Sequence, residues 1–164
     1  MKKKFLVLGM FVFTFLATAS TAHAVHYTTW TNAVDAREIR WNGGTAYRDQ
    51  LNAAIVTWNA MRSINIAPDN IMTIEDVRIS DVNRRDLDWS GVYMWLPFTD
   101  QIAFNRAYLL NSNNNHRQAV ITHELGHALG LDHSIWGNVM VSGVRDQTFL
   151  GPQDISDYRF LWGN

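Results

Sequence analysis

Residues 123–133 read His-Glu-Leu-Gly-His-Ala-Leu-Gly-Leu-Asp-His, and the interpretation of the whole chain starts from this stretch. It lies in an apolar run that predicts a buried helix over residues 116–129. His123 and His127 stand four positions apart on one face of that helix, so both imidazoles can reach a single Zn²⁺. Glu124 lies beside the first histidine and can reach a water on the metal without being a ligand.

A third histidine follows the helix at a distance that a tight turn can close. Gly130 can adopt the left-handed conformation that ends a helix and turns the chain, which would return His133 to the metal. Three histidine ligands leave the fourth position of a tetrahedral zinc for water, as in catalytic sites. His116 stands two turns before His123, so we expect it to be a solvated first-turn residue and not a ligand.

Two other interpretations of the motif compete with a catalytic zinc site. The helix could hold its histidines by coincidence, in a structural protein without metal, but two imidazoles and a carboxylate on a buried apolar helix would then lack partners. The chain could also be a zinc-dependent binding module without turnover, and Glu124 argues against this because it serves only catalysis. A match at five fixed positions is rare by chance, so the catalytic interpretation is preferred.

Residues 123–134, which end in Ser134 after the third histidine, resemble the zinc-binding motif of the metzincins, and specifically its matrixin form. Met140, seven residues after His133, resembles the methionine of the Met-turn that lies beneath the metal in this family. The resemblance implies an α+β, zincin-like metzincin catalytic domain. Such a domain has a mixed twisted sheet of about five strands, an N-terminal helix, a central zinc-binding helix and a C-terminal helix.

The rest of the chain predicts these elements in the same order. Apolar residues recur at intervals of three and four over residues 45–61, which predicts an amphipathic helix. A last helix is expected from Pro152, a residue suited to the first helical turn. Alternating or β-rich stretches predict strands at 38–41, around Ile64 and Ile66, around Val77 and Ile79, at 92–96 and at 102–104.

The resemblance implies a zinc-dependent endopeptidase with His123, His127 and His133 as metal ligands. A zinc-activated water would attack the peptide bond, with Glu124 as general base and then as acid for the leaving amine. The expected partners are protein or peptide substrates, and the chain is expected to be a monomer. An extended substrate would add as a strand to the edge formed by Val92, Tyr93, Met94, Trp95 and Leu96.

The sequence also departs from the matrixin pattern. No histidine occurs between residues 27 and 115, so we expect no second, structural zinc. Val141-Ser142-Gly143 follows Met140 where matrixins usually have a proline, so substrate specificity cannot be carried over. The loop acids leave Ca²⁺ binding open, although no regular calcium-loop pattern is present.

If the enzyme is made in an inactive form, something other than a cysteine thiol must block its zinc. The chain has no cysteine, so it can have neither a disulfide nor a cysteine that blocks the zinc. One hypothesis is that residues 25–37 cross the cleft, with Asp35 reaching the metal.

Residues 1–24 have the features of a secretory signal. Three lysines, Lys2–Lys4, precede an apolar run over Phe5–Ala19, and Ala22-His23-Ala24 is a small-x-small cleavage site. We therefore expect a secreted, extracellular catalytic domain over residues 25–164, with no membrane association after cleavage.

The charge distribution argues against nucleic-acid binding. The full chain has 14 basic and 15 acidic side chains, but every lysine lies in the signal. The remainder carries eleven arginines against fifteen acids, a formal charge of −4. An acidic domain of this kind lacks the basic surface that nucleic acids require.

Overall fold

The computed structural model describes residues 25–143 and 146–163, and the predicted signal at residues 1–24 lies outside them. None of the helices in this described part of the chain is long and apolar enough to cross a membrane. The elements follow in the order β1 (Glu38–Gly43), α1 (Arg48–Asn59), β2 (Asn65–Pro68), β3 (Val77–Val82), β4 (Gly91–Met94), β5 (Asp100–Asn105), α2 (Arg106–Leu109), α3 (Asn114–Ala128) and α4 (Pro152–Trp162).

The five strands form one mixed sheet in the order β2-β1-β3-β5-β4. All neighbours are parallel except β4, which pairs antiparallel with β5 at the edge. Parallel neighbours need a crossover connection, and α1 supplies it between β1 and β2. Inner side chains such as Ile39 and Val77 are buried, while Arg40 and Arg78 of the same strands are not.

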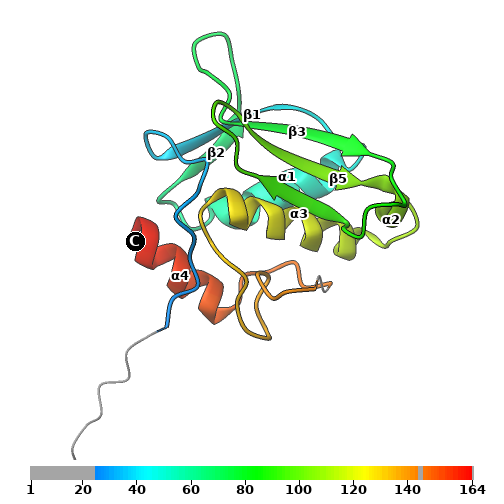
Figure 1. Cartoon of the computed structure of the whole chain (residues 1–164). Helices are drawn as coiled ribbons and strands as arrows, with labels where there is room; N and C mark the ends of the chain where they lie inside the picture. Colours follow the sequence, from blue (N-terminus) through cyan, green and yellow to red (C-terminus); the bar gives the residue numbers. More distant parts are fainter. Residues whose placement is uncertain (1–24, 144–145, 164) are drawn as a thin grey trace, which may run out of the picture.

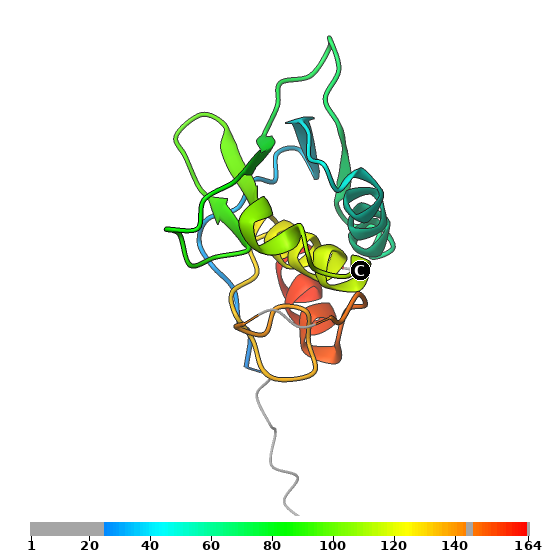
Figure 2. The same cartoon turned by 90° about the vertical axis from the view of Figure 1, so that its right-hand side faces the viewer.

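Helices α1 and α3 pack on one face of the sheet, and α4 lies on the side of α3 that faces away from the sheet (Figures 1 and 2). Leu51 of α1 and Leu125 of α3 are fully or almost fully buried in the core between these layers. Trp58 of α1 donates its indole N–H to Thr122 O of α3 (2.8 Å) and stacks on Tyr158 of α4 with ring centroids 5.9 Å apart. The side chain of Trp58 therefore links α1, α3 and α4.

This architecture confirms the predicted α+β class, with a mixed five-stranded sheet, an N-terminal helix, a central helix and a C-terminal helix. The edge strand, however, ends at Met94, so the prediction that it includes Trp95 and Leu96 is wrong. The reason is local: the Leu96 N–H donates to Asp100 Oδ1 (2.8 Å), which turns the chain before Pro97.

Candidate metal centre

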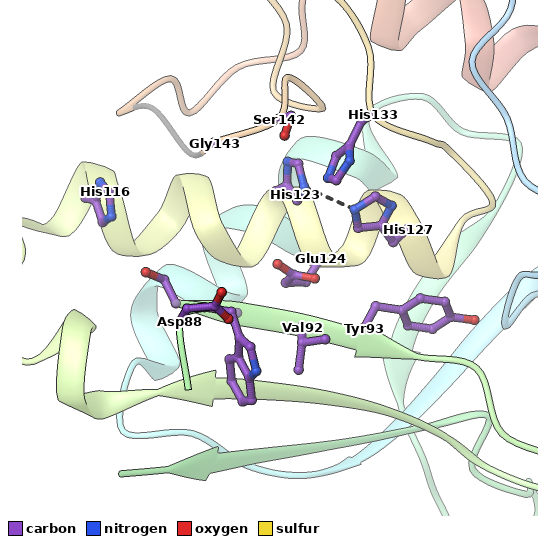
Figure 3. Close-up of a pocket in the computed structure, with 13 residues that line it drawn as sticks. Asp88, Val92, Tyr93, His116, His123, Glu124, His127, His133, Ser142 and Gly143 are labelled. Carbon is purple, nitrogen blue, oxygen red and sulfur yellow. Dashed lines mark hydrogen bonds between the residues drawn. The ribbon is translucent and has the colours of Figure 1, made fainter. Parts of the chain in front are cut away.

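Three histidines from two consecutive segments converge in the structure (Figure 3). His123 and His127 lie one turn apart on α3, and His133 returns from the turn that follows the helix. One nitrogen from each ring lies within 4.8 Å of the other two, and the ring centroids are 4.7–5.2 Å apart. Gly130 has a φ of +88°, and this left-handed residue lets the chain return.

Hydrogen bonds of the first two rings fix which nitrogen faces the centre. His123 Nδ1 lies 2.8 Å from Val139 O, and His127 Nδ1 lies 2.8 Å from Leu131 O. A carbonyl oxygen only accepts, so each Nδ1 carries the proton and each Nε2 presents a lone pair. The two Nε2 atoms lie 3.1 Å apart, and two lone pairs at that separation repel unless a cation lies between them.

This arrangement fits zinc. Tetrahedral zinc with Zn–N bonds of about 2.0–2.1 Å places neighbouring ligand nitrogens about 3.3 Å apart. Hydrogen bonds from Nδ1–H to carbonyls are the usual support of metal-ligating histidines. Within residues 25–143 and 146–163, this is the one group of three or more His, Cys, Asp or Glu side chains found that could hold a metal. The predictions about a second zinc and about calcium stay untested.

Burial keeps the imidazoles of His123 and His127 neutral. It lowers the pKa of His123 to about 4, with the neighbouring His127 adding to the effect, and it also lowers the pKa of His127. Neutral imidazole is the form that binds a metal. At neutral pH, therefore, neither ring has to lose a proton before it can bind one.

Glu124 lies between α3 and β4 in Figure 3 and is only 5% exposed. Burial raises the pKa of its carboxyl to about 8, and the Tyr93 backbone N–H, which donates to the carboxyl, acts in the opposite direction. The charge of a divalent cation among the three imidazoles would lower this pKa further. A bound metal therefore favours the carboxylate form that a general base requires.

The three histidines open into a cleft of about 420 Å³. Helix α3 forms one wall, β4 and the residues before it form another, and Ser142 with Gly143 form a third (Figure 3). Because β4 pairs with β5 on one side only, the backbone of its other edge is available along this cleft. His116 also lines the cleft, with its Nδ1 2.9 Å from Asp146 Oδ1, and it is not among the converging ligands.

A family model of the M43 peptidases, described as pregnancy-associated plasma protein-A, matches residues 55–156, which include the three histidines, Glu124 and Met140. The chain belongs to the M43 peptidase family. This family is a zinc-dependent metalloprotease family of metzincin type. A comparison with curated protein sequences gives no match.

Solved structures share the fold of this M43 peptidase. The GM1-bound form of the ECX AB5 holotoxin has a TM-score of 0.54 at 15% identity, over 77% of this chain and 80% of that chain. Myroilysin has a TM-score of 0.52 at 14% identity, over 84% of this chain and 96% of its own. At these identities the likeness shows the fold alone, and together with the family it confirms the zincin-like, metzincin architecture.

The turn at Met140, the candidate Met-turn of this M43 peptidase, is fastened by α4. Met140 is fully buried, and its sulfur lies so close to Gly126 that a Cβ at that position would overlap it. The buried Asp154 of α4 accepts from the Val139 N–H (2.7 Å) and the Met140 N–H (3.1 Å). Since the Val139 carbonyl accepts from His123 Nδ1, α4 orients this candidate ligand through the turn. No local sequence pattern marks Asp154 for this role.

Residues 25–37 do not take the predicted path across the cleft. None of them lines it, and the backbone of Asp35 instead exchanges two hydrogen bonds with Glu38 (3.0 and 2.8 Å). Ala36 and Arg37 have positive φ angles of 46° and 67°, which make the tight turn that leads into β1. The hypothesis that Asp35 reaches the metal is therefore wrong.

Gly91 allows β4 to lie close to the catalytic helix. A Cβ at this position would lie 2.9 Å from Glu124 Oε1 and 2.7 Å from Val120 Cγ1. We predict that Gly91→Ala displaces the carboxyl and lowers kcat for peptide cleavage by about tenfold or more, because small misplacements of a catalytic group are costly. Zinc affinity, measured by competition with a chelator, should change little.

The control for this prediction is Gly44→Ala. The nearest atom to a Cβ at Gly44 is the flexible end of Arg48, at 3.5 Å, so this variant adds the same methyl group without a collision. An equal kcat in the two variants would contradict the role assigned to Gly91.

Proposed function

We propose that the chain is a secreted zinc endopeptidase in which His123, His127 and His133 hold the metal and Glu124 is the catalytic base. The observation that carries the proposal is that the Nε2 atoms of His123 and His127, each with a lone pair, lie 3.1 Å apart beside Glu124, a residue that is only 5% exposed. A module that only binds zinc has no use for this carboxyl, whose burial costs free energy.

Each residue of the centre then has a defined task. A bound Zn²⁺ would lower the pKa of a water in its fourth position and polarise the scissile carbonyl. Glu124 accepts a proton from the attacking water and donates it to the leaving amine. The carbonyls of Val139 and Leu131 hold the first two imidazoles in orientation. Met140 packs beneath them and takes no part in bond making.

An extended peptide would bind as an additional strand along the free edge of β4. Backbone hydrogen bonds to such an edge fix the register of the substrate without requiring a particular side chain. Because β4 ends at Met94, this pairing is limited to Gly91–Met94, and the Leu96 N–H beyond the strand is already bonded to Asp100. A substrate that must adopt a strand comes from an unfolded or loop segment, which favours endopeptidase action.

The proposal also includes the matrixin-like subtype, the location and the assembly. Ser134 after His133 supports the matrixin-like form, and its N–H donates to Met140 O (2.8 Å), which ties the segment of the third ligand to the Met-turn. The signal features of residues 1–24 support secretion to the extracellular space. The mature chain is proposed to act as a monomer on protein or peptide substrates.

Removal of the metal tests the proposed function. We predict that the mature protein contains one zinc per chain, that a strong chelator abolishes its cleavage of an unstructured protein, and that added Zn²⁺ restores it. Elemental analysis and an assay of peptide fragments measure the two quantities. Stoichiometric zinc without cleavage of any peptide in a library would identify a binding module instead. No zinc after reconstitution would contradict the metal centre itself.

A further inference from the structure

Residues 128–133, which we name the ligand loop, begin at the last residue of α3. Residues 25–33 run along this loop and form what we name the N-terminal strap. The Thr29 N–H donates to Gly130 O (2.8 Å), and Tyr27 O accepts from the Asp132 N–H (3.0 Å). Thr28 and Leu131 form an antiparallel bridge between these two bonds. Figure 1 shows the strap, in blue, passing between α4 and the chain that follows α3.

The first residues of the strap are fastened to α4. Gln153 Nε2 donates to Val25 O (2.7 Å), and His26 Nδ1 lies 3.0 Å from Asp157 Oδ1. The Asp157 side chain is only 1% exposed. The His26 ring also stacks on Phe160, with centroids 4.1 Å apart and an angle of 12° between the planes. The strap is therefore held at its end as well as along its length.

The ligand loop connects the second metal ligand with the third. Its Leu131, which faces Thr28 of the strap, is also the residue whose carbonyl accepts from His127 Nδ1 (2.8 Å). His133 follows Asp132 directly, and the ring of His133 has no hydrogen bond to a carbonyl among those found in the described residues, unlike the rings of His123 and His127. Its position therefore depends on the backbone of the loop.

We infer that the N-terminal strap is a positioning element for the metal centre: it holds the ligand loop so that His133 and the Leu131 carbonyl are in place before the metal binds. This inference rests on the proposed function. Without the strap, Gly130 O and Asp132 N would lose their partners, and the loop would be held by fewer hydrogen bonds before the metal binds, such as that from the Ser134 N–H to Met140 O. Strap docking thus sets the affinity for zinc.

Thr29→Pro tests the inference because proline removes the N–H that bonds to Gly130 O. We expect zinc affinity, measured by competition with a chromophoric chelator, to fall by about 10–100-fold, the effect typical of lost support around metal ligands. Excess zinc should restore kcat. The urea midpoint of the zinc-free protein, measured in parallel, separates a loss of affinity from a loss of the fold.

Two controls match this variant. Thr31→Pro introduces proline into the same strap at a residue whose N–H has no hydrogen bond among those found. Thr29→Val keeps the N–H but loses the hydroxyl, which donates to Thr31 O (2.7 Å). Both controls should bind zinc like the wild type. Equal affinities in Thr29→Pro and Thr31→Pro, or a lower urea midpoint with unchanged affinity, would show that the strap only stabilises the fold.

If Thr29→Pro does not fold, a second variant tests the same inference. His26→Ala combined with Gln153→Ala frees the end of the strap without changing a residue that pairs with the ligand loop. Zinc affinity should again fall, whereas Arg159→Ala, an exposed change on the same helix, should leave it unchanged. Wild-type affinity in the double variant would overturn the inference alone. A wild-type protein that fails to bind zinc would instead overturn the proposed function.

Discussion

Glu124→Gln is expected to bind zinc as the wild type does and to cleave peptides about 10²–10⁴-fold more slowly, the usual contribution of a general acid–base group. Glutamine has the size of glutamate and can occupy the same space between α3 and β4, but its amide cannot take a proton from water. The loss should appear in kcat, because Glu124 is not one of the three residues that hold the metal.

Glu75→Gln is the matched control, because it makes the same chemical change outside the cleft. Its kcat should equal that of the wild type. Both variants are measured with one internally quenched peptide at saturating zinc, and their zinc content is determined on the same samples. A wild-type kcat in Glu124→Gln would show that another group is the base.

Asp154→Ala is expected to lower the free energy of unfolding by about 3–5 kcal/mol, since each buried N–H left without a partner costs about 1–3 kcal/mol. The Asp154 side chain accepts from the backbone N–H groups of Val139, Met140 and Gly151, at 2.7–3.1 Å, and the residue is fully buried. Alanine leaves these three donors unpaired beneath the metal. Urea unfolding of the zinc-free protein measures the change.

Asp86→Ala provides the comparison for this stability prediction. Asp86 is exposed and paired with Arg84, and surface ion pairs of this kind contribute little to stability. Its urea midpoint should stay near that of the wild type. If Asp154→Ala unfolds at the same urea concentration as Asp86→Ala, the Met-turn does not depend on α4.

The convergence of the three histidines could be predicted because it depends on residues that lie close together in the sequence. A spacing of four places His123 and His127 on one face of a helix, and a glycine after the helix allows His133 to return. The start of the helix is equally local: Asn113 caps it by accepting from the His116 N–H (2.8 Å). Such features depend on neighbours within one or two turns, which the sequence displays directly.

The supports of the centre could not be predicted, because they join segments that are far apart in the chain. Asp154 contacts residues 14 and 15 positions earlier, and Thr29 pairs with Gly130 across about a hundred residues. No periodicity or spacing encodes such partners. The early end of β4 has a different cause, a contact only four residues along the chain from the Leu96 N–H to Asp100, which no alternation of side chains indicates. Local patterns therefore identified the three histidines that converge and missed what holds them.

The position of α4 has a consequence for the cell that makes this protein. A ribosome synthesises all three histidine ligands before it synthesises α4, and Asp154, Gln153 and Asp157 of this helix fasten the Met-turn and the strap. Until α4 has emerged and docked, the nascent chain would carry the three histidines without these supports. If the proposed function is right, proteolytic activity would therefore arise only after α4 has been synthesised and has docked, and not as soon as the three histidines are in the chain.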